Sequence, residues 1–250
     1  MLNFKQYEGL PKNASEAIEQ CVLANRILAN EGVLDGFGHV SVRNPENSKT
    51  FFQARSIAPE FVNKEDILEI DLEGNIVTNT NFRAYGERII HASIYKYRTD
   101  VQAVFHGHPT EIIALSCLNI PIRSVAQYCG MFYEPLPFYD DYEPGCGMLI
   151  VTQKEGDRVA RTLGNALGLV MRGHGCTVVG ANVQQMVMNA IFLRDNAKIQ
   201  YLALALGEPK YLSEQEGRET TKAQYSENSL GRCWNYWVAR AKKAMPDLNF

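Results

Sequence analysis

The feature that most constrains this chain is an apolar run that ends in two histidines one residue apart. The run AVF at residues 103–105 is typical of a buried strand, and Pro109 cannot continue a β-ladder because it has no N–H donor. His106 and His108 therefore mark the end of the strand. Side chains at positions i and i+2 of a strand point to the same face. The sequence thus predicts that both imidazoles face one way, as a metal ion would require.

Composition indicates a globular protein with a substantial core. The chain has 250 residues, 46% of them hydrophobic, and a net charge of −3. It contains no basic block, so we expect no nucleic-acid partner. It contains no run of about 18 apolar residues, so we expect no membrane span. Residues 1–15 lack the basic-then-apolar pattern of a secretory signal.

Six cysteines are spread along the chain without pairs or CxxC spacing. In a chain of this length the pattern is typical of a reduced, cytoplasmic protein with buried thiols. Cys176 lies two residues after His174, close enough to contact a metal ion there, although packing in the core is the preferred interpretation.

Helical and strand patterns interleave without a low-complexity linker or an internal repeat. Helical spacing predicts helices over residues 14–31, 86–98, 109–117, 155–167 and 183–206. Alternation and turn residues predict strands over residues 39–43, 50–54, 66–77, 101–106, 167–173 and 176–180. We expect a single α/β domain over residues 1–250 with a mixed sheet, a core over about 14–206 and a C-terminal extension over 207–250.

The polar segment 212–232 is expected to be a solvated, mobile connection to a last helix around residues 233–245. The Trp and Tyr residues of that helix need a surface to pack on, either the body of the protein or a neighbouring subunit.

The histidines are expected at the ends of elements or on a polar helix face, where function usually resides. They are His39, His91, His106, His108 and His174. Glu87 and His91 are spaced i, i+4 on the predicted helix 86–98 and so share a face. A short connection leads from that helix to the strand that ends at His106, so this face can reach the end of the strand.

Three histidines with one carboxylate form a donor set that suits Zn²⁺, Mn²⁺ or Fe²⁺. Three histidines with an open position are typical of a catalytic ion, because a structural site needs four fixed ligands. Each residue also has a simpler interpretation, namely a structural histidine or a solvated helical pair.

Four motifs together resemble the class II aldolase/adducin family: GHVSVR (38–43), YGERIIHASIY (85–95), AVFHGHP (103–109) and MRGHGCTVVG (171–180). The resemblance covers residues 14–206. It implies a three-layer α/β/α sandwich with a mixed central sheet, and a ring-like homotetramer with its sites between neighbouring subunits.

By motif, the resemblance implies one divalent ion per subunit, with Zn²⁺ preferred over Mn²⁺ and Fe²⁺. The metal ligands would be His106, His108 and His174. Glu87 would be a fourth ligand or the acid–base group, and His91 would support the ligands from behind.

The chain departs from the sugar-phosphate aldolases of that family where they hold phosphate. Those enzymes use an Asn in GNxS, a Thr-Gly loop and a Ser-Ser pair before the glutamate. This chain has His39, the stretch 54–62 and Tyr85-Gly86 there, which argues against a phosphorylated sugar. In exchange it offers arginines for a carboxylate and aromatic rings for a flat substrate, namely Arg43, Arg55, Arg83, Arg172, Tyr85, Tyr128 and Phe132.

These motifs look like a branch that contains decarboxylases of hydroxylated aromatic carboxylates and an iron-dependent oxygenase. We expect a metal-dependent carbon–carbon lyase acting on a small, non-phosphorylated hydroxy- or oxo-carboxylate, and a decarboxylase before other lyases. The metal would take up the charge left after C–C cleavage. Glu87 is the first candidate for proton transfer, with His39 or Tyr128 as the second.

Substrate binding is assigned to Arg55, Arg83, Tyr85 and Arg172. Three alternatives remain: an aldolase or epimerase on a sugar or sugar acid, a non-heme Fe(II) oxygenase, and a non-catalytic adducin-like assembly module. The retained histidines argue against the last.

Overall fold

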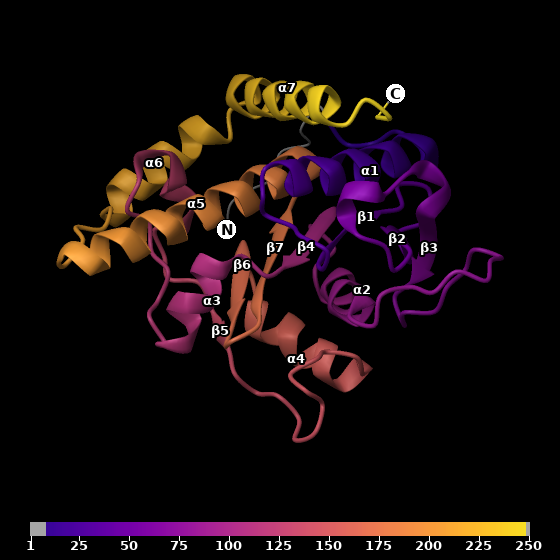
Figure 1. Ribbon diagram of the computed structural model, residues 1–250, viewed down its shortest axis with the longest axis horizontal. Helices are drawn as coiled ribbons and strands as arrows, with labels where there is room; N and C mark the ends of the chain where they lie inside the picture. The colour runs from indigo at the N-terminus through magenta and orange to yellow at the C-terminus, as the bar shows by residue number, and fades with distance from the viewer. Residues whose placement is uncertain (1–8, 249–250) are drawn as a thin grey trace.

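The computed structural model describes residues 9–248, which form a seven-stranded mixed sheet between two layers of helices (Figure 1). The strand order is β3-β2-β1-β4-β7-β6-β5, and only the β5–β6 pair is parallel. The strands are β1 (His39–Arg43), β2 (Thr50–Ala54), β3 (Ile67–Asp71), β4 (Ala103–Gly107), β5 (Phe138–Tyr139), β6 (Gly168–Met171) and β7 (Gly175–Gly180). The predicted three-layer α/β/α fold is confirmed.

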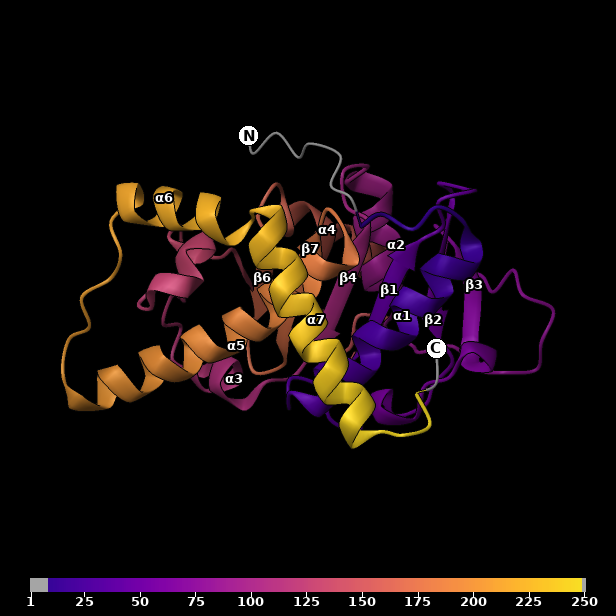
Figure 2. The ribbon, with the colours of Figure 1, turned by 90° about the horizontal axis from the view of Figure 1, so that it is seen from above.

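The helices divide between the two faces of the sheet. One layer holds α1 (Ala14–Asn30), α3 (Thr110–Cys117), α5 (Val183–Leu206) and α7 (Glu227–Ala244), and the other holds α2 (Arg88–Tyr97) and α4 (Gln153–Leu163). Seen from above, α7 lies across α1 and α5 (Figure 2). The remaining helical segments are η1 (Pro59–Phe61), η2 (Lys64–Asp66), η3 (Gln127–Phe132) and α6 (Glu214–Gln224).

The same strands contribute to two hydrophobic cores, because successive side chains of a strand point to opposite faces. Val40, Phe105 and Val178 are buried beneath the layer that contains α1 and α5. Val104 and Val179 are buried beneath α2 and α4. Each face of the sheet is therefore covered along its centre.

The predicted strand over residues 66–77 ends earlier, at Asp71. The Asp71 carboxylate accepts hydrogen bonds from the backbone N–H groups of Glu73 and Asn75 (3.0 and 2.8 Å), which closes a turn. Beyond it, only an isolated bridge between Ile70 and Ile76 continues the pairing. Side-chain bonding of an Asp to the backbone two residues on is a turn signal.

The segment 212–232 is largely exposed, as predicted, but it is helical and not an irregular connection, because it forms α6 and the start of α7. Ser213 and Glu216 form a capping box at the start of α6. Gly217 faces the ring of Tyr133 so closely that an added Cβ would lie 2.3 Å from the Cβ of Tyr133. Capping and this tight contact hold a polar helix that carries few apolar residues.

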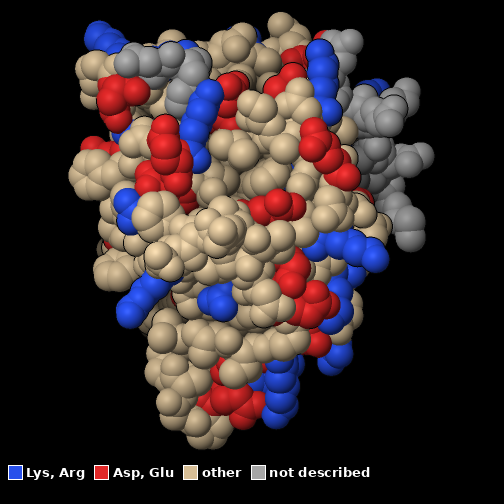
Figure 3. All heavy atoms as spheres, turned by 90° about the vertical axis from the view of Figure 1, so that its right-hand side faces the viewer, with Lys and Arg blue, Asp and Glu red and all other residues tan. Residues whose placement is uncertain are grey.

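No helix among residues 9–248 is long and apolar enough to cross a membrane. The cysteines are free thiols, and Cys21, Cys129 and Cys176 are buried. Part of the N-terminal stretch without a secretory pattern, residues 1–8, lies outside the described residues. On the face shown in Figure 3, basic side chains lie among acidic and uncharged ones and form no continuous basic area.

Candidate metal centre

The register of the sheet places three polar side chains in a row across neighbouring strands. His39 of β1 is paired with His106 of β4, which in turn is paired with Thr177 of β7. All three are buried. Val104 and Val179, which share their face, belong to the core beneath α2 and α4, so this row faces α2. His108 follows the end of β4.

A tight turn between β6 and β7 brings His174 to the same place. Gly175 has φ +157°, and a Cβ at this position would lie 2.2 Å from the carbonyl oxygen of Gly107. A residue without a side chain is therefore required for β7 to approach the end of β4 so closely. As a result, the ring of His174 lies parallel to the ring of His108, with 5.1 Å between the ring centroids.

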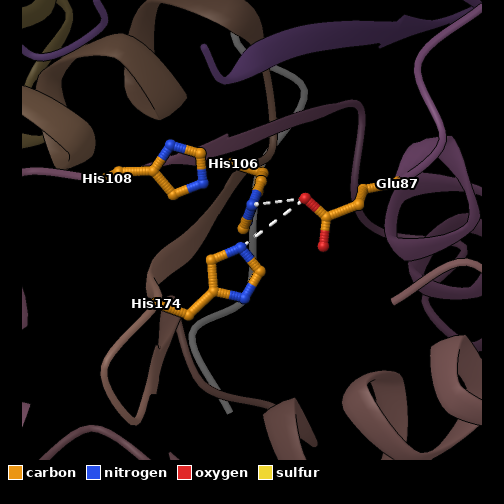
Figure 4. A group of neighbouring side chains, drawn as sticks. All are labelled: Glu87, His106, His108 and His174. Atoms are coloured by element: carbon orange, nitrogen blue, oxygen red, sulfur yellow. Dashed lines mark ion pairs between the residues drawn. The ribbon is translucent and has the colours of Figure 1, made fainter. Parts of the chain in front are cut away.

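Glu87 takes a different position from the one predicted. The helix α2 begins at Arg88, and Glu87 is the residue before it, so it does not form the predicted i, i+4 helical pair with His91. One carboxylate oxygen, Oε1, accepts a hydrogen bond from the backbone N–H of Ile150 (3.0 Å). The other, Oε2, lies 3.5 Å from Nε2 of both His106 and His174 (Figure 4).

His91 also departs from the prediction of a polar helix face, since it is fully buried. Its Nε2 lies 2.7 Å from Nδ1 of His39, and its Nδ1 lies 2.6 Å from Oγ of Ser41. Ser41 Oγ in turn lies 2.9 Å from the hydroxyl of Tyr95. His91 is thus not one of the four clustered residues, and it contacts β1 through His39 and Ser41.

The four residues named by the motifs come together in space. Glu87, His106, His108 and His174 each offer one ligand atom, and these atoms all lie within 4.8 Å of one another. The ring centroid of His106 is 5.0 Å from that of His108 and 5.0 Å from that of His174. Figure 4 shows the three rings and the carboxylate directed toward a common point.

The electrostatics of the cluster favour the forms that bind metal ions. Burial raises the pKa of Glu87, but the imidazoles of His106 and His174, 3.5 Å away, outweigh this effect and hold the pKa far below its usual range. Burial, and then the charges of His106 and His174, lower the pKa of His108 to about 4. A carboxylate and a neutral imidazole are the forms that ligate.

Nε2 of His106, which faces Glu87, is buried without a hydrogen-bond partner. The other nitrogen of His106, Nδ1, lies 3.3 Å from Oγ1 of Thr177. Metal-bound histidines commonly donate their second N–H in this way, which directs the free nitrogen at the ion. The residues therefore fit a divalent cation such as Zn²⁺, Mn²⁺ or Fe²⁺.

Cys176 does not belong to this group. It is 1% exposed and packs in the core beneath α1 and α5, on the opposite face of β7 from Thr177. Burial raises the pKa of its thiol well above the ordinary value. The preferred interpretation from the sequence, packing in the core, agrees with this position.

A cleft of about 320 Å³ opens beside the cluster. Its polar lining includes His39, Glu87 and His108, and its apolar lining includes Phe37, Ile57, Tyr85, Leu149 and Val151. The rings of Tyr85 and His39 are 4.5 Å apart between centroids, and the Tyr85 hydroxyl donates to the carbonyl of Ile57. Burial raises the pKa of Tyr85 to about 12, so this phenol is neutral.

The arginines predicted to bind a substrate carboxylate do not line this cleft. Arg55 is paired with Asp66 (2.6 Å). Arg172 is paired with Asp140, and both side chains are nearly half exposed. Arg83 is exposed. Ion pairs with neighbouring carboxylates and exposure to solvent therefore account for these guanidinium groups within the chain.

Three other predicted residues also lie elsewhere. Arg43 is buried and donates to backbone carbonyls, including those of Val101 and Tyr95, so it serves the fold. Phe132 is fully buried in the core. Tyr128 packs edge-on against Phe192 of α5, with 5.1 Å between ring centroids. Of the aromatic residues proposed for a flat substrate, the structure places Tyr85 alone at the cleft.

The motifs did not single out Ser41, Thr177, Tyr95 or the backbone of Ile150. Strand alternation offers a signal for the first two, because each is a polar residue whose two neighbours in the strand are apolar. No sequence signal reveals the contact made by Ile150, since any residue supplies a backbone N–H.

Comparison with known proteins gives consistent results. The family model described as "Class II Aldolase and Adducin N-terminal domain" matches residues 19–201. The chain is 29% identical to decarboxylase tropJ of Talaromyces stipitatus, over 90% of this chain and 94% of that protein. It is 30% identical to 3,4-dihydroxyphthalate decarboxylase of Arthrobacter keyseri, over 72% of this chain and 76% of that protein.

Among solved structures, the fold is similar to that of L-fuculose 1-phosphate aldolase from Glaciozyma antarctica. The TM-score is 0.79 and the sequence identity 25%, and the match covers 92% of this chain and 90% of that one.

Proposed function

The chain belongs to the class II aldolase and adducin family, and from this premise we propose that it is a divalent-metal-dependent carbon–carbon lyase. Its reaction is the decarboxylation of a non-phosphorylated hydroxylated aromatic, hydroxy- or oxo-carboxylate. The observation that carries the proposal is the convergence of Glu87, His106, His108 and His174 within 4.8 Å at the edge of a cleft. Two similar proteins, tropJ and 3,4-dihydroxyphthalate decarboxylase, bear the names of decarboxylases.

His106, His108 and His174 would hold one ion per subunit, with Zn²⁺ the first choice and Mn²⁺ or Fe²⁺ the alternatives. When bound, the ion supplies Lewis-acid stabilisation of the negative charge that C–C cleavage leaves on a substrate oxygen. The three histidines come from β4, its end, and the β6–β7 turn, so the sheet itself fixes their spacing.

Glu87 would carry the proton. The Ile150 N–H holds one of its oxygens, which leaves the second directed at the cluster. As a carboxylate it can take the proton of a substrate hydroxyl and return it to the carbon from which CO₂ departs.

The lining of the cleft supports a substrate with a flat, uncharged body. Phe37, Tyr85 and Leu149 offer apolar surface, and no Lys or Arg lines the cleft among the described residues. A phosphate group would find no cation there within one chain, whereas a carboxylate can be held at the metal. This composition favours an aromatic carboxylate over a sugar phosphate.

We also propose a cytoplasmic homotetramer with sites at subunit interfaces. Phe37 and Leu149 are 73% and 48% exposed at the cleft, which suits contact with another subunit. Tyr128 lies away from the cleft lining of its own chain, so its predicted role in proton transfer requires a neighbouring subunit.

The test is release of CO₂ from a panel of ortho-hydroxylated aromatic carboxylates, under argon and in air, with and without a chelator. We expect release that a chelator abolishes and that oxygen does not affect. Release only in air would replace the proposal with an oxygenase. Failure on every carboxylate, with cleavage of sugars or sugar acids instead, would replace it with an aldolase.

The proton-transfer role of Glu87 is tested separately with Glu87→Gln. We expect retained metal and a loss of turnover of about 10²–10⁴-fold, the usual contribution of a general acid–base group. Full turnover with the metal still bound would exclude this role.

A further inference from the structure

A chain of hydrogen-bonded side chains leads from the cleft into the protein. His39 lines the cleft, and its Nδ1 faces Nε2 of His91 at 2.7 Å. The other nitrogen of His91 faces Ser41 Oγ at 2.6 Å, and Ser41 faces the hydroxyl of Tyr95 at 2.9 Å. All four residues are at most 3% exposed, so their hydrogen bonds are shielded from bulk solvent.

The inner end of the chain sets the direction of every bond in it. The Tyr95 hydroxyl contacts Ser41 Oγ and a backbone group of Val104. The contact with Val104 lowers the pKa of the phenol, as a donating backbone N–H does, so Ser41 Oγ is the acceptor that remains. A buried O–H without an acceptor is costly, so Tyr95 must donate its proton to Ser41. Ser41 then has to donate its own proton to the remaining partner, Nδ1 of His91. Each donor is thereby satisfied once.

The same assignment of donors and acceptors extends to the imidazoles of His91 and His39. Both rings are neutral, because Nδ1 of each ring is an acceptor in this chain and so carries no proton. A neutral imidazole carries one proton. Since Nδ1 of His91 accepts from Ser41, the proton of His91 is on Nε2 and is donated to Nδ1 of His39. The proton of His39 is therefore on Nε2.

A separate contact agrees with this direction. In the orientation of its amide, Gln53 places Nε2 3.3 Å from Nδ1 of His39. An amide nitrogen only donates, so this orientation is compatible with Nδ1 of His39 as an acceptor. Nε2 of His39 has no hydrogen-bond partner among residues 9–248. The two nitrogens of an imidazole point to different sides, so Nε2 is directed away from His91.

We propose that His39 is held as its Nε2–H tautomer and donates a hydrogen bond to a substrate oxygen in the cleft, with His91, Ser41 and Tyr95 as positioning residues. The inference rests on the proposed function for the identity of the substrate. The ring of His39 is 5.3 Å from that of His106 between centroids, so an oxygen bound beside the cluster is within reach. A neutral imidazole can polarise such an oxygen without surrendering its proton.

The chain also explains why His39 is a donor of hydrogen bonds and not a source of protons. If His39 gave up its Nε2 proton, it would have to take a proton from His91. His91 would in turn take one from Ser41, and Ser41 would take one from Tyr95, which would become a phenolate. Burial raises the pKa of Tyr95 well above its ordinary value, so a phenolate there is strongly disfavoured. Transfer of the proton to the substrate carbon remains with Glu87.

The tautomer can be read directly without a substrate. The protein is labelled with [¹⁵N]histidine, loaded with Zn²⁺, and examined by long-range ¹H–¹⁵N correlation NMR, which distinguishes the two tautomers from the charged ring. The signals of His39 are assigned by their loss in His39→Gln. We expect the Nε2–H pattern for His39 and for His91. An Nδ1–H pattern for His39 overturns the proposal, whether or not the protein decarboxylates anything.

The positioning role is tested with Ser41→Ala, which removes the donor to His91. We expect His39 to lose its single tautomer and kcat to fall about tenfold with KM little changed. Ser93→Ala is the matched control, because Ser93 is also fully buried but bonds to Gln153 and Asp157. An unchanged tautomer in Ser41→Ala, or an equal loss of kcat in Ser93→Ala, overturns the role.

The donor itself is tested by comparing His39→Gln with His39→Ala. The amide N–H of Gln can stand where Nε2–H stood, so we expect kcat at least tenfold above that of His39→Ala. Equal kcat values for the two variants would overturn the role of His39 as a donor. If the unmodified protein released no CO₂ but His39 showed the Nε2–H tautomer, the proposed function would be wrong and the proposed tautomer would stand.

Discussion

The two faces of the central sheet differ although the same strands build them. Toward α1 and α5, β4 and β7 present Phe105 and Val178. Toward α2, the adjacent positions of the same strands present His106 and Thr177. Adjacent residues of one strand thus contribute to an apolar core on one face of the sheet and to a polar site on the other.

The difference shows how a sheet can carry chemistry without losing its core. Burial of apolar side chains on one face supplies free energy at no electrostatic cost. Buried polar groups on the other face cost free energy unless they are hydrogen-bonded. Ser41 and His91 satisfy each other there, while Nε2 of His106 stays free for a ligand. Changes on the two faces should therefore separate function from stability.

The largest expected effect is on activity, from His106→Gln on the polar face. Loss of a ligand should release the ion and lower turnover by about a thousandfold or more, since Lewis-acid stabilisation amounts to several kcal/mol. Metal content by mass spectrometry and CO₂ release measure it. With chelator present, the urea midpoint should stay close to that of the parent. A large drop in that midpoint would mean that this face also carries stability.

The next effect is on stability, from Phe105→Ala, one residue away on the opposite face. Phe105 is fully buried, and its removal should lower the free energy of unfolding by about 3–5 kcal/mol. Urea denaturation measures it. Under native conditions we expect the folded variant to bind its metal as the parent does. A folded protein without metal would show that the two faces are coupled.

The sequence predicted the structure well where the periodic pattern of a single strand or helix determines it. Alternation located β1 and β2 at the residues where the structure has them, and helical spacing located α5. The motifs named the four residues that converge at the cleft. In each case the signal and the structure depend on the same local period.

The sequence was less informative where the decisive contact is made by a residue that belongs to no periodic pattern. The polar helix α6 has little apolar periodicity, although Ser213 and Glu216 form a capping signal that was available. Arg172 was predicted to bind a substrate because it adjoins His174; in the structure it is paired with Asp140, 32 residues earlier. Sequence position does not reveal which carboxylate lies opposite a given arginine.

A smaller effect is expected from Thr177→Val, which keeps the shape of the side chain but removes the partner of Nδ1 of His106. Such supporting contacts typically contribute 10–100-fold to metal affinity, so we expect a loss of about that size. Competition with a chromophoric chelator measures the affinity. Thr50→Val is the control, because Thr50 is also a buried strand threonine but bonds to Glu69. Equal losses in both variants would refute a specific role of Thr177.

The smallest effect is expected from Arg172→Ala, at the turn outside both faces. Its ion pair with Asp140 is nearly half exposed, and exposed pairs contribute about 0–1 kcal/mol to stability. Because the guanidinium is engaged with Asp140 and does not line the cleft, we expect KM to change by less than about twofold, a difference below about 0.5 kcal/mol.

Arg158→Ala is a suitable comparison, since Arg158 pairs with Glu143 of the same loop. A tenfold rise in KM for Arg172→Ala alone would mean that this arginine leaves Asp140 to bind the substrate. The site would then extend beyond the polar face of the sheet onto the β6–β7 turn.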